Sequence, residues 1–279
     1  MRRLALWISL SLLVGCSSVL GLRDVSLNGD GGSAQRDGST DKVADGRQPD
    51  AEDGPPLDAA KDDIPRVGLH LWLRADAGVI PADGSSIARW LDQSSNGRNA
   101  SMATVTRQPS LVGGALNGLP VVRFLGAQSL VLEILSTPTE FSFFVVGKNS
   151  MPSESFSMIL GKSDNAPNHQ LRWENGSQAL FVTHNAGTII ISPIGNTRIY
   201  HALSARYDGA TMTWYRDGNA TSSSAYTASA PWTIAQVGAW SSTDFLVGDL
   251  AEVIIYDRAL SEVERESVNI YLQRKYSLP

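Results

Sequence analysis

The chain has 279 residues, 42% of them apolar, with 23 basic and 28 acidic side chains and a net charge of -5. Residues 1–64 hold 7 of the basic and 11 of the acidic side chains, which leaves 16 and 17 in residues 65–279. The larger part is therefore nearly neutral, and a chain without a basic face is not expected to bind nucleic acid.

The amino terminus has the pattern of a secretory signal. Arg2 and Arg3 precede the apolar run Leu4–Val14, which is shorter than the roughly 20 apolar residues that span a membrane. The run ends in Leu13-Val14-Gly15-Cys16, which resembles the lipobox of bacterial lipoproteins. The resemblance implies cleavage before Cys16, the chain's only cysteine, and lipidation of its thiol. We predict a signal peptide over residues 1–15 and a membrane anchor at Cys16. The alternative is an ordinary secretory signal with an incidental cysteine.

Residues 16–64 are predicted to form a disordered, acidic tether. They are rich in Asp, Gly, Ala, Ser and Pro, so they cannot bury enough apolar surface to offset the entropy of the chain. Asp-Gly pairs recur there, which raises the alternative of a calcium-binding repeat. The segment 41–46 lacks the middle acidic or Asn ligand that an EF-hand loop requires, so the sequence disfavours this alternative. Ser17 follows the cysteine where the inner-membrane retention signal of well-studied lipoproteins has Asp. We therefore expect a bacterial cell-envelope protein of the outer membrane.

Residues 65–279 form one domain-sized block of short segments rich in Val, Ile, Phe, Tyr and Trp, separated by Gly, Asn, Asp and Pro. Many short strands without intervening helices predict an all-β fold, an antiparallel jelly-roll β-sandwich. The predicted strands are 69–73, 87–91, 120–125, 129–133, 141–147, 157–161, 170–173, 179–183, 188–192, 199–207, 211–216, 233–238 and 252–257.

One helix is predicted at the carboxyl end. Ser261 and Glu264 form a capping box, in which each side chain can bond the other's backbone amide. Val263, Ile270 and Tyr271 then share a face at helical spacing, and we expect the helix to pack on the sandwich.

Several blocks in the same part resemble bacterial LamG-like jelly-roll domains of the concanavalin A-like lectin/glucanase superfamily. They are the segments 71–78, 90–100, 117–124, 204–218 and 248–261, which run in order through nearly all of residues 68–278. The resemblance implies the fold but no single activity, because that fold carries lectins, adhesion modules and glycosidases.

The loop from Asp92 to Asn99 is the best candidate metal site. Asp92, Asn96 and Asn99 place oxygen atoms in a Gly-containing turn, a ligand set that suits calcium, and some relatives bind calcium at the sandwich edge. Asp249 and Glu252 of the closing strand could complete the site. The alternative is that Asp92 and Asn96 make Asx-turns to nearby amides.

Aromatic side chains are the candidates for stacking on sugar rings. Trp173, Trp232 and Trp240 are predicted as ligand-binding residues, and Trp232 and Trp240 are expected to be the most exposed because they flank a strand near polar loops. Trp72 and Trp90 are expected in the core.

Catalysis is not expected. A glycosidase of this superfamily would carry two or three acids at alternate positions of one strand, so that they share a face, and no strand here has that pattern. Glu133, Glu174 and Glu252 stand singly. The predicted function is a lipid-anchored surface protein, not an enzyme, whose module binds carbohydrate or an extracellular protein surface. The alternatives are a structural or adhesion spacer without a sugar site and, further off, a glycosidase.

Overall fold

The computed structural model describes residues 64–279 except 138–139, 152–155, 163–168, 184–187, 229, 241 and 243. The chain divides into two units, residues 1–54 and 55–279, and every described residue lies in the second. The predicted signal peptide, Cys16 and all of the predicted tether before Ile64 lie outside the described residues, so the anchor and the domain boundaries stay predictions. No helix in the described part is long and apolar enough to cross a membrane.

Strands dominate the described part, which also holds one 3-10 helix, η1 (Val105–Arg107), and one α-helix, α1 (Glu262–Tyr276). The strands are β1 (Leu69–Arg74), β2 (Val79–Asp83), β3 (Ser86–Trp90), β4 (Ala100–Ser101), β5 (Ser110–Gly114), β6 (Gly118–Leu125), β7 (Leu130–Ser136), β8 (Phe141–Asn149), β9 (Ser157–Lys162), β10 (His169–Glu174), β11 (Gln178–Thr183), β12 (Thr188–Pro193), β13 (His201–Tyr207), β14 (Thr211–Arg216), β15 (Asn219–Ala225), β16 (Thr233–Val237) and β17 (Val247–Tyr256).

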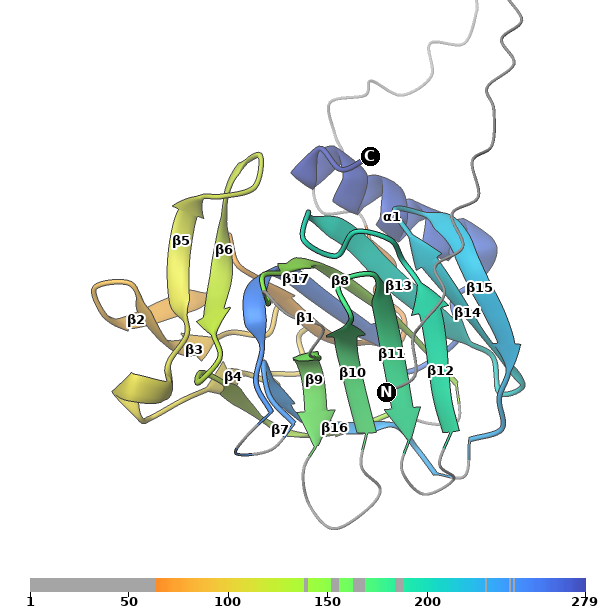
Figure 1. Cartoon of the computed structure of the whole chain (residues 1–279), viewed down its shortest axis with the longest axis horizontal. Helices are drawn as coiled ribbons and strands as arrows, with labels where there is room; N and C mark the ends of the chain where they lie inside the picture. Colours follow the sequence, from red (N-terminus) through yellow and green to blue (C-terminus); the bar gives the residue numbers. More distant parts are fainter. Residues whose placement is uncertain are drawn as a thin grey trace, which may run out of the picture. The chain divides into compact units, whose positions relative to one another are not determined.

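One layer, which we call the helix-side sheet, has the order β15-β14-β13-β8-β17 (Figure 1). The free edge of β17 is shared by two strands, because β6 pairs with residues 247–250 and β1 pairs with residues 252–256. Strand β5 extends this edge by pairing with β6. All of these pairings are antiparallel, as the sequence predicted.

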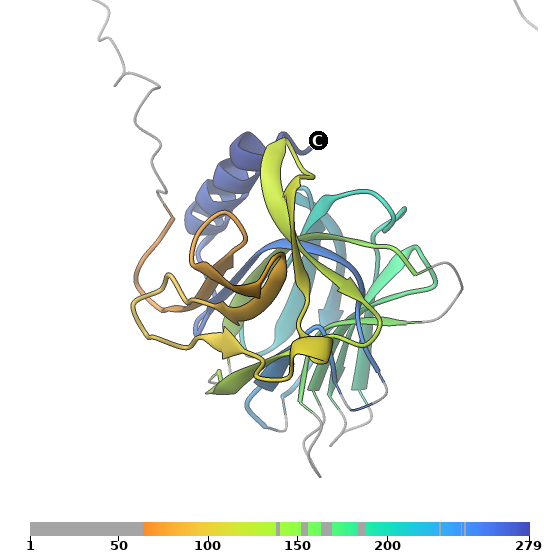
Figure 2. The ribbon, with the colours of Figure 1, turned by 90° about the vertical axis from the view of Figure 1, so that its left-hand side faces the viewer.

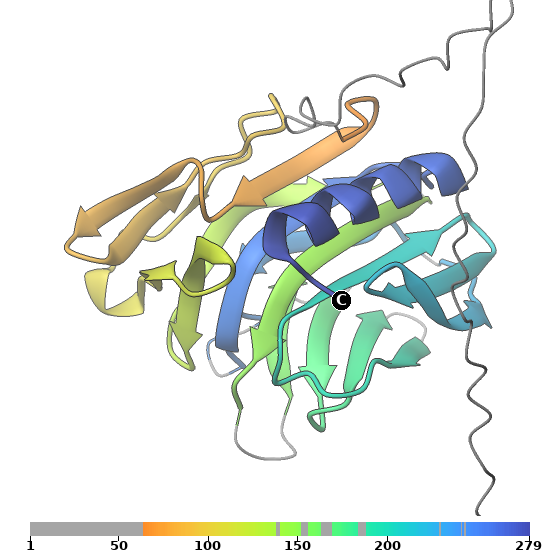
Figure 3. The ribbon, with the colours of Figure 1, turned by 90° about the horizontal axis from the view of Figure 1, so that it is seen from above.

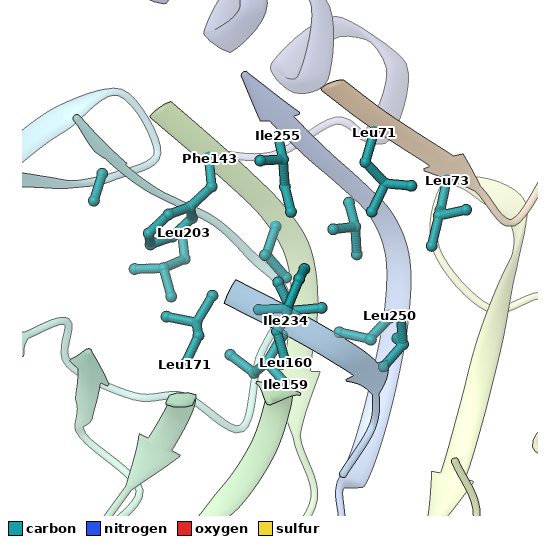
Figure 4. Close-up of a cluster of buried hydrophobic side chains, with 14 of the residues drawn as sticks. Leu71, Leu73, Phe143, Ile159, Leu160, Leu171, Leu203, Ile234, Leu250 and Ile255 are labelled. Atoms are coloured by element: carbon teal, nitrogen blue, oxygen red, sulfur yellow. The ribbon is translucent and has the colours of Figure 1, made fainter. Parts of the chain in front are cut away.

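The second sheet faces the first and has the order β12-β11-β10-β9-β16-β7-β4-β3-β2. The main core lies between the two layers (Figure 4). Leu250 and Ile255 of β17 and Phe143 of β8 face Ile159 of β9 and Ile234 of β16, all fully buried. Because alternate residues of a strand point to opposite faces, the other residues of β17 and β8 point away from this core.

A second core lies on the opposite face of the helix-side sheet, under α1 (Figure 3). Val268, Leu272 and Tyr276 of the helix pack there with Trp72 and Ile254 of the sheet. We call this surface of the sheet its outer face. Both faces of β17 are therefore covered along its carboxyl-terminal half.

The capping box at the start of α1 is confirmed. Ser261 Oγ accepts from the Glu264 amide at 3.3 Å, and the Glu264 carboxylate accepts from the Ser261 amide at 2.9 Å. The predicted buried face is wrong for Val263, which is 81% exposed, and for Ile270, which is 37% exposed, whereas Tyr271 packs against the second core. The face that packs on the sheet is offset from it and includes the polar residues Arg265 and Asn269.

The β5–β6 hairpin rises beside α1 (Figure 2). Asn117 at its tip donates from Nδ2 to the Lys275 carbonyl at 3.0 Å. The hairpin and the helix therefore meet over the outer face of the helix-side sheet.

The antiparallel β-sandwich with one carboxyl-terminal helix is confirmed, but β2, β4, β5 and β15 were not predicted. Strand β15 has no large apolar residue, so its sequence carries no strand signal. It pairs with β14 through the two-residue turn Asp217-Gly218, whose φ angles of 50° and 83° fit the type I′ turn that Asp-Gly favours.

Candidate functional site

A bulge in β17 places two buried acids on the outer face of the helix-side sheet. The register against β8 shifts between Leu250 and Glu252, so Asp249 and Glu252 lie on the same side although they are three residues apart. Each is only 1% exposed. A buried carboxylate needs hydrogen-bonded or charged partners, and the two acids obtain them from different neighbours.

Glu252 lies in what we call the helix-covered cluster, which consists of Glu252, Trp72, Tyr271, Lys275 and Tyr276. Its carboxylate accepts from the Trp72 indole, from Lys275 Nζ at 2.8 Å and from the hydroxyls of Tyr276 at 2.7 Å and Tyr271 at 3.1 Å. Burial, together with the neighbouring Glu252 carboxylate, raises the pKa of Tyr276, which keeps that hydroxyl a donor. This cluster joins α1 to β1 and β17.

Asp249 lies in what we call the open cluster, which consists of Asp249, Arg123, Lys148 and Tyr200. Arg123 of β6 donates from Nε at 2.7 Å and from Nη2 at 2.9 Å, and the Tyr200 hydroxyl donates at 2.6 Å. Lys148 Nζ of β8 lies 3.6 Å from the carboxylate and 4.7 Å from the centre of the Tyr200 ring. The side chains of Arg123 and Lys148 are 36% and 27% exposed, so this cluster reaches solvent.

The protonation states within the open cluster follow from these contacts. Burial opposes ionisation of Asp249, but hydrogen bonds from Arg123 and Tyr200 outweigh it and hold the pKa of Asp249 below its usual value. Burial and the bond to Asp249 raise the pKa of Tyr200. At neutral pH the cluster therefore has one carboxylate, one guanidinium, one ammonium and a neutral phenol, with a formal charge of +1.

The Asp92 carboxylate is occupied by N–H and O–H donors. Its Oδ1 accepts from the amides of Trp72 and Ser94, both at 2.9 Å. Its Oδ2 accepts from the Ser94 hydroxyl at 2.7 Å and the Arg98 amide at 3.0 Å, and Asn99 Oδ1 accepts from the Asp92 amide at 2.9 Å. The bond from the Ser94 amide is an Asx-turn contact of the kind that the sequence offered as the alternative to a metal site, whereas the Trp72 and Arg98 amides lie farther away along the chain.

Asn96 ties the same loop to the start of β1, since its Nδ2 donates to the carbonyls of Leu69 at 2.8 Å and His70 at 3.1 Å. Asp249 and Glu252 bond the partners named above. Among the described residues, no group of three or more His, Cys, Asp or Glu side chains could hold a metal ion. Calcium at Asp92, Asn96 and Asn99 stays an untested prediction.

The expected exposure of Trp232 is wrong. Trp232 is 2% exposed, and its ring centre lies 4.9 Å from that of Phe141 and 5.6 Å from that of Phe143. Trp173 is also in the main core, at 3% exposure. The loops flanking Trp232 look polar, but Thr137 bonds the Trp232 carbonyl and holds the residue at the sheet.

Trp240 is half-buried rather than exposed. Its backbone packs against Gly161 of β9, where an added Cβ would lie 2.7 Å from the Trp240 Cα. Trp72 and Trp90, at 2% and 0% exposure, are core residues as predicted.

Sequence reasoning missed Arg123, Lys148 and Tyr200. Arg123 could have been found from strand alternation, because Val122 and Phe124 on either side of it are fully buried in the main core. Its partner could not, since the pairing of β6 with the first half of β17 joins residues 126 positions apart.

Residues 135–264 match the family model described as the concanavalin A-like lectin/glucanases superfamily. No curated protein matches the chain. Among solved structures, the chain is similar to the sialidase of Trypanosoma rangeli in complex with the inhibitor DANA, with a TM-score of 0.54, 15% identity and 77% of this chain covered. The chain spans 34% of the length of that sialidase.

The chain is also similar to domain 4 of a GH43 extracellular arabinanase from Geobacillus stearothermophilus, in complex with arabinotriose. That match has a TM-score of 0.50 and 15% identity, and it covers 72% of this chain and 98% of that domain. Likenesses at this level of identity show the fold alone.

The prediction that the chain is not an enzyme is corrected by these matches, because its fold is shared with structures of a sialidase and of an arabinanase domain. The prediction rested on the absence of acids alternating along one strand. The bulge in β17 removes that ground, since it places Asp249 and Glu252 on one face without alternation.

Proposed function

We propose, from the concanavalin A-like lectin/glucanase domain at residues 135–264, that this protein binds carbohydrate on the outer face of its helix-side sheet, at the open cluster. The observation that carries the proposal is the set of solvent-reaching donors that Arg123 and Lys148 hold around the buried Asp249 carboxylate. Saccharides are recognised by a few polar groups held in fixed positions, and strands hold such groups more firmly than loops do.

The geometry gives each residue of the open cluster a separate task. Asp249 fixes the Arg123 guanidinium through two hydrogen bonds, and the Tyr200 hydroxyl fixes the carboxylate in turn. Lys148 lies over the Tyr200 ring, which restrains the ammonium group. The arabinanase domain of similar fold, solved with arabinotriose, supports a saccharide as the ligand class.

The protein is proposed to work at the bacterial cell surface. The lipobox-like stretch ending at Cys16 would anchor it in the outer membrane, and residues 17–64 would carry the domain away from the lipid. Mass spectrometry of the wild type and of Cys16→Ala tests the anchor. A wild-type Cys16 without lipid would contradict it.

A glycan array probed with the full chain in mild detergent, with calcium and with chelator, tests the carbohydrate proposal. We expect binding to a subset of glycans that the Arg123→Gln/Asp249→Asn variant loses while its thermal unfolding stays cooperative. Glycans bound by the wild type are also incubated and assayed for newly formed reducing ends. Release of reducing ends would assign hydrolysis to the chain.

Binding to no glycan by a folded chain would contradict the proposal and favour the adhesion or spacer hypothesis. Binding that survives in the double variant would place the sugar site elsewhere on the sandwich. A calcium requirement would support the metal proposal for the loop containing Asp92.

A further inference from the structure

We propose that the open cluster selects an acidic saccharide, one whose rings carry a carboxylate or a sulfate group. This inference rests on the proposed function and adds the chemical class of its ligand. The argument comes from which charges of the cluster are buried and which reach solvent.

The negative charge of the open cluster is covered and its positive charges are not. Asp249 is 1% exposed, whereas the Arg123 and Lys148 side chains are 36% and 27% exposed. An approaching ligand therefore meets a guanidinium and an ammonium group before it meets the carboxylate. A surface with this order of charges attracts anions.

The N–H groups of Arg123 and Lys148 that do not bond Asp249 are suited to an anionic oxygen of a ligand. Arg123 uses Nε and Nη2 on Asp249, and the two N–H groups of its Nη1 take no part in those bonds. Lys148 Nζ is 3.6 Å from Asp249, beyond a good hydrogen bond, so its donors are available to a ligand. Hydrogen bonds from charged donors to an anion are about twice as strong as neutral ones.

The two cations are held in place before a ligand arrives. The Asp249 carboxylate fixes the Arg123 side chain, and the Tyr200 ring lies 4.7 Å from Lys148 Nζ. The raised pKa of Tyr200 keeps its hydroxyl a donor to Asp249, so it adds no second negative charge at neutral pH. A prearranged pair of cations loses little conformational freedom on binding.

The helix-covered cluster shows why the second acid of β17 does not contribute a comparable surface. Its cation, Lys275, is 11% exposed and bonds both Glu252 and Asp76. Its donors are consumed inside the fold. Of the two acids of β17, only Asp249 of the open cluster has cationic partners that reach solvent.

The experiment measures binding of tetragalacturonate to the full chain by calorimetry, with the methyl-esterified tetramer as a neutral ligand of the same ring structure. A 6-sulfated galactose tetramer is the third probe and separates a sulfate from a carboxylate. We expect esterification to weaken binding about fivefold or more, as loss of one partly exposed ion pair does. We also expect the free acid to bind more weakly as salt increases.

Lys148→Gln is the test variant, because its 3.6 Å contact with Asp249 contributes little to the fold. Arg89→Gln is the matched control, since it removes one positive charge from an exposed position on β3. We expect Lys148→Gln to lose about fivefold in affinity for the acidic tetramer, and Arg89→Gln to bind like the wild type.

Equal binding of the acid and its methyl ester would overturn the inference, and so would equal losses in Lys148→Gln and Arg89→Gln. Binding of neutral glycans without any acidic one would overturn it while leaving the proposed function standing. Binding of no saccharide by the folded chain would contradict both. Preference for the sulfated tetramer over tetragalacturonate would support the inference with sulfate as the acidic group.

Discussion

The two halves of β17 show how one strand can carry two equally buried acids with different consequences. Asp249 and Glu252 are each 1% exposed and lie on one face of the sheet. Asp249 is covered by Arg123, Lys148 and Tyr200, from two strands and a loop that leave the cations open to solvent. Glu252 is covered by α1, whose Tyr276 is buried and whose Lys275 side chain is only 11% exposed.

Burial of an acid therefore does not by itself indicate a functional site. What differs is the exposure of the partners, because a ligand can reach only those donors that the fold has not consumed. We expect the helix-covered cluster to contribute mainly to stability and the open cluster mainly to binding, and this contrast can be tested by substitution.

Glu252→Gln is expected to have the largest effect on stability. Removing one charge of a buried ion pair leaves Lys275 without its nearest counter-charge and typically costs about 3 kcal/mol. Urea unfolding followed by circular dichroism measures the free energy of unfolding. Glu133→Gln, at an exposed position on β7, is the control and should change it by less than about 0.5 kcal/mol. Equal effects of the two substitutions would remove the stabilising role from the helix-covered cluster.

Arg123→Gln is expected to have an intermediate effect, since it leaves the buried Asp249 carboxylate with fewer donors. We expect a loss of about 1–2 kcal/mol in the free energy of unfolding, discounted for the partial exposure of Arg123. The Arg123→Gln/Asp249→Asn variant removes both charges and should recover part of that loss while glycan binding stays absent. Additive losses in a double-mutant cycle would show that the two residues do not act as a pair.

Asp92→Ala removes an acid that, unlike Asp249 and Glu252, is bonded by backbone amides and one hydroxyl. We expect a loss of about 1 kcal/mol, as for removal of a side chain that caps backbone donors. The melting temperature should fall equally in calcium and in chelator if these hydrogen bonds account for the effect. A fall confined to calcium would identify Asp92 as a metal ligand.

The sandwich and the helix start could be predicted because local signals and tertiary structure agree there. Ser261 and Glu264 cap the helix through contacts within four residues, and the Asp217-Gly218 turn sets its own backbone angles. The buried face of α1 was open to prediction from apolar spacing, because Val268, Leu272 and Tyr276 recur every four residues, but the prediction named Val263 and Ile270 instead. Its position depends on contacts with β1 and β17, where Tyr276 and Lys275 bond Glu252.

The candidate site was only half predictable, for a related reason. Asp249 and Glu252 could be singled out as acids, but a bulge decides which face each occupies, and nothing local in Leu250-Ala251 announces it. Trp232 was misplaced because its polar flanks suggested a loop, whereas Phe141 and Phe143 from a distant strand enclose its ring. Contacts between segments far apart in sequence determined each of these outcomes.

The smallest expected effect is on the acid sensitivity of the open cluster. The pKa of Asp249 is held below its usual value of 3.8, since bonds from Arg123 and Tyr200 outweigh the effect of burial. Its contribution to stability is therefore complete above the usual pKa and is lost as the pH falls through the lower, folded-state pKa. The Arg123→Gln/Asp249→Asn variant lacks this contribution, so its melting temperature should fall less than that of the wild type between about pH 5 and pH 3. Equal falls in melting temperature over that range would show that Asp249 is no better stabilised as an anion in the fold than in the unfolded chain. The cations of the open cluster would then interact with solvent and not stabilise the Asp249 carboxylate.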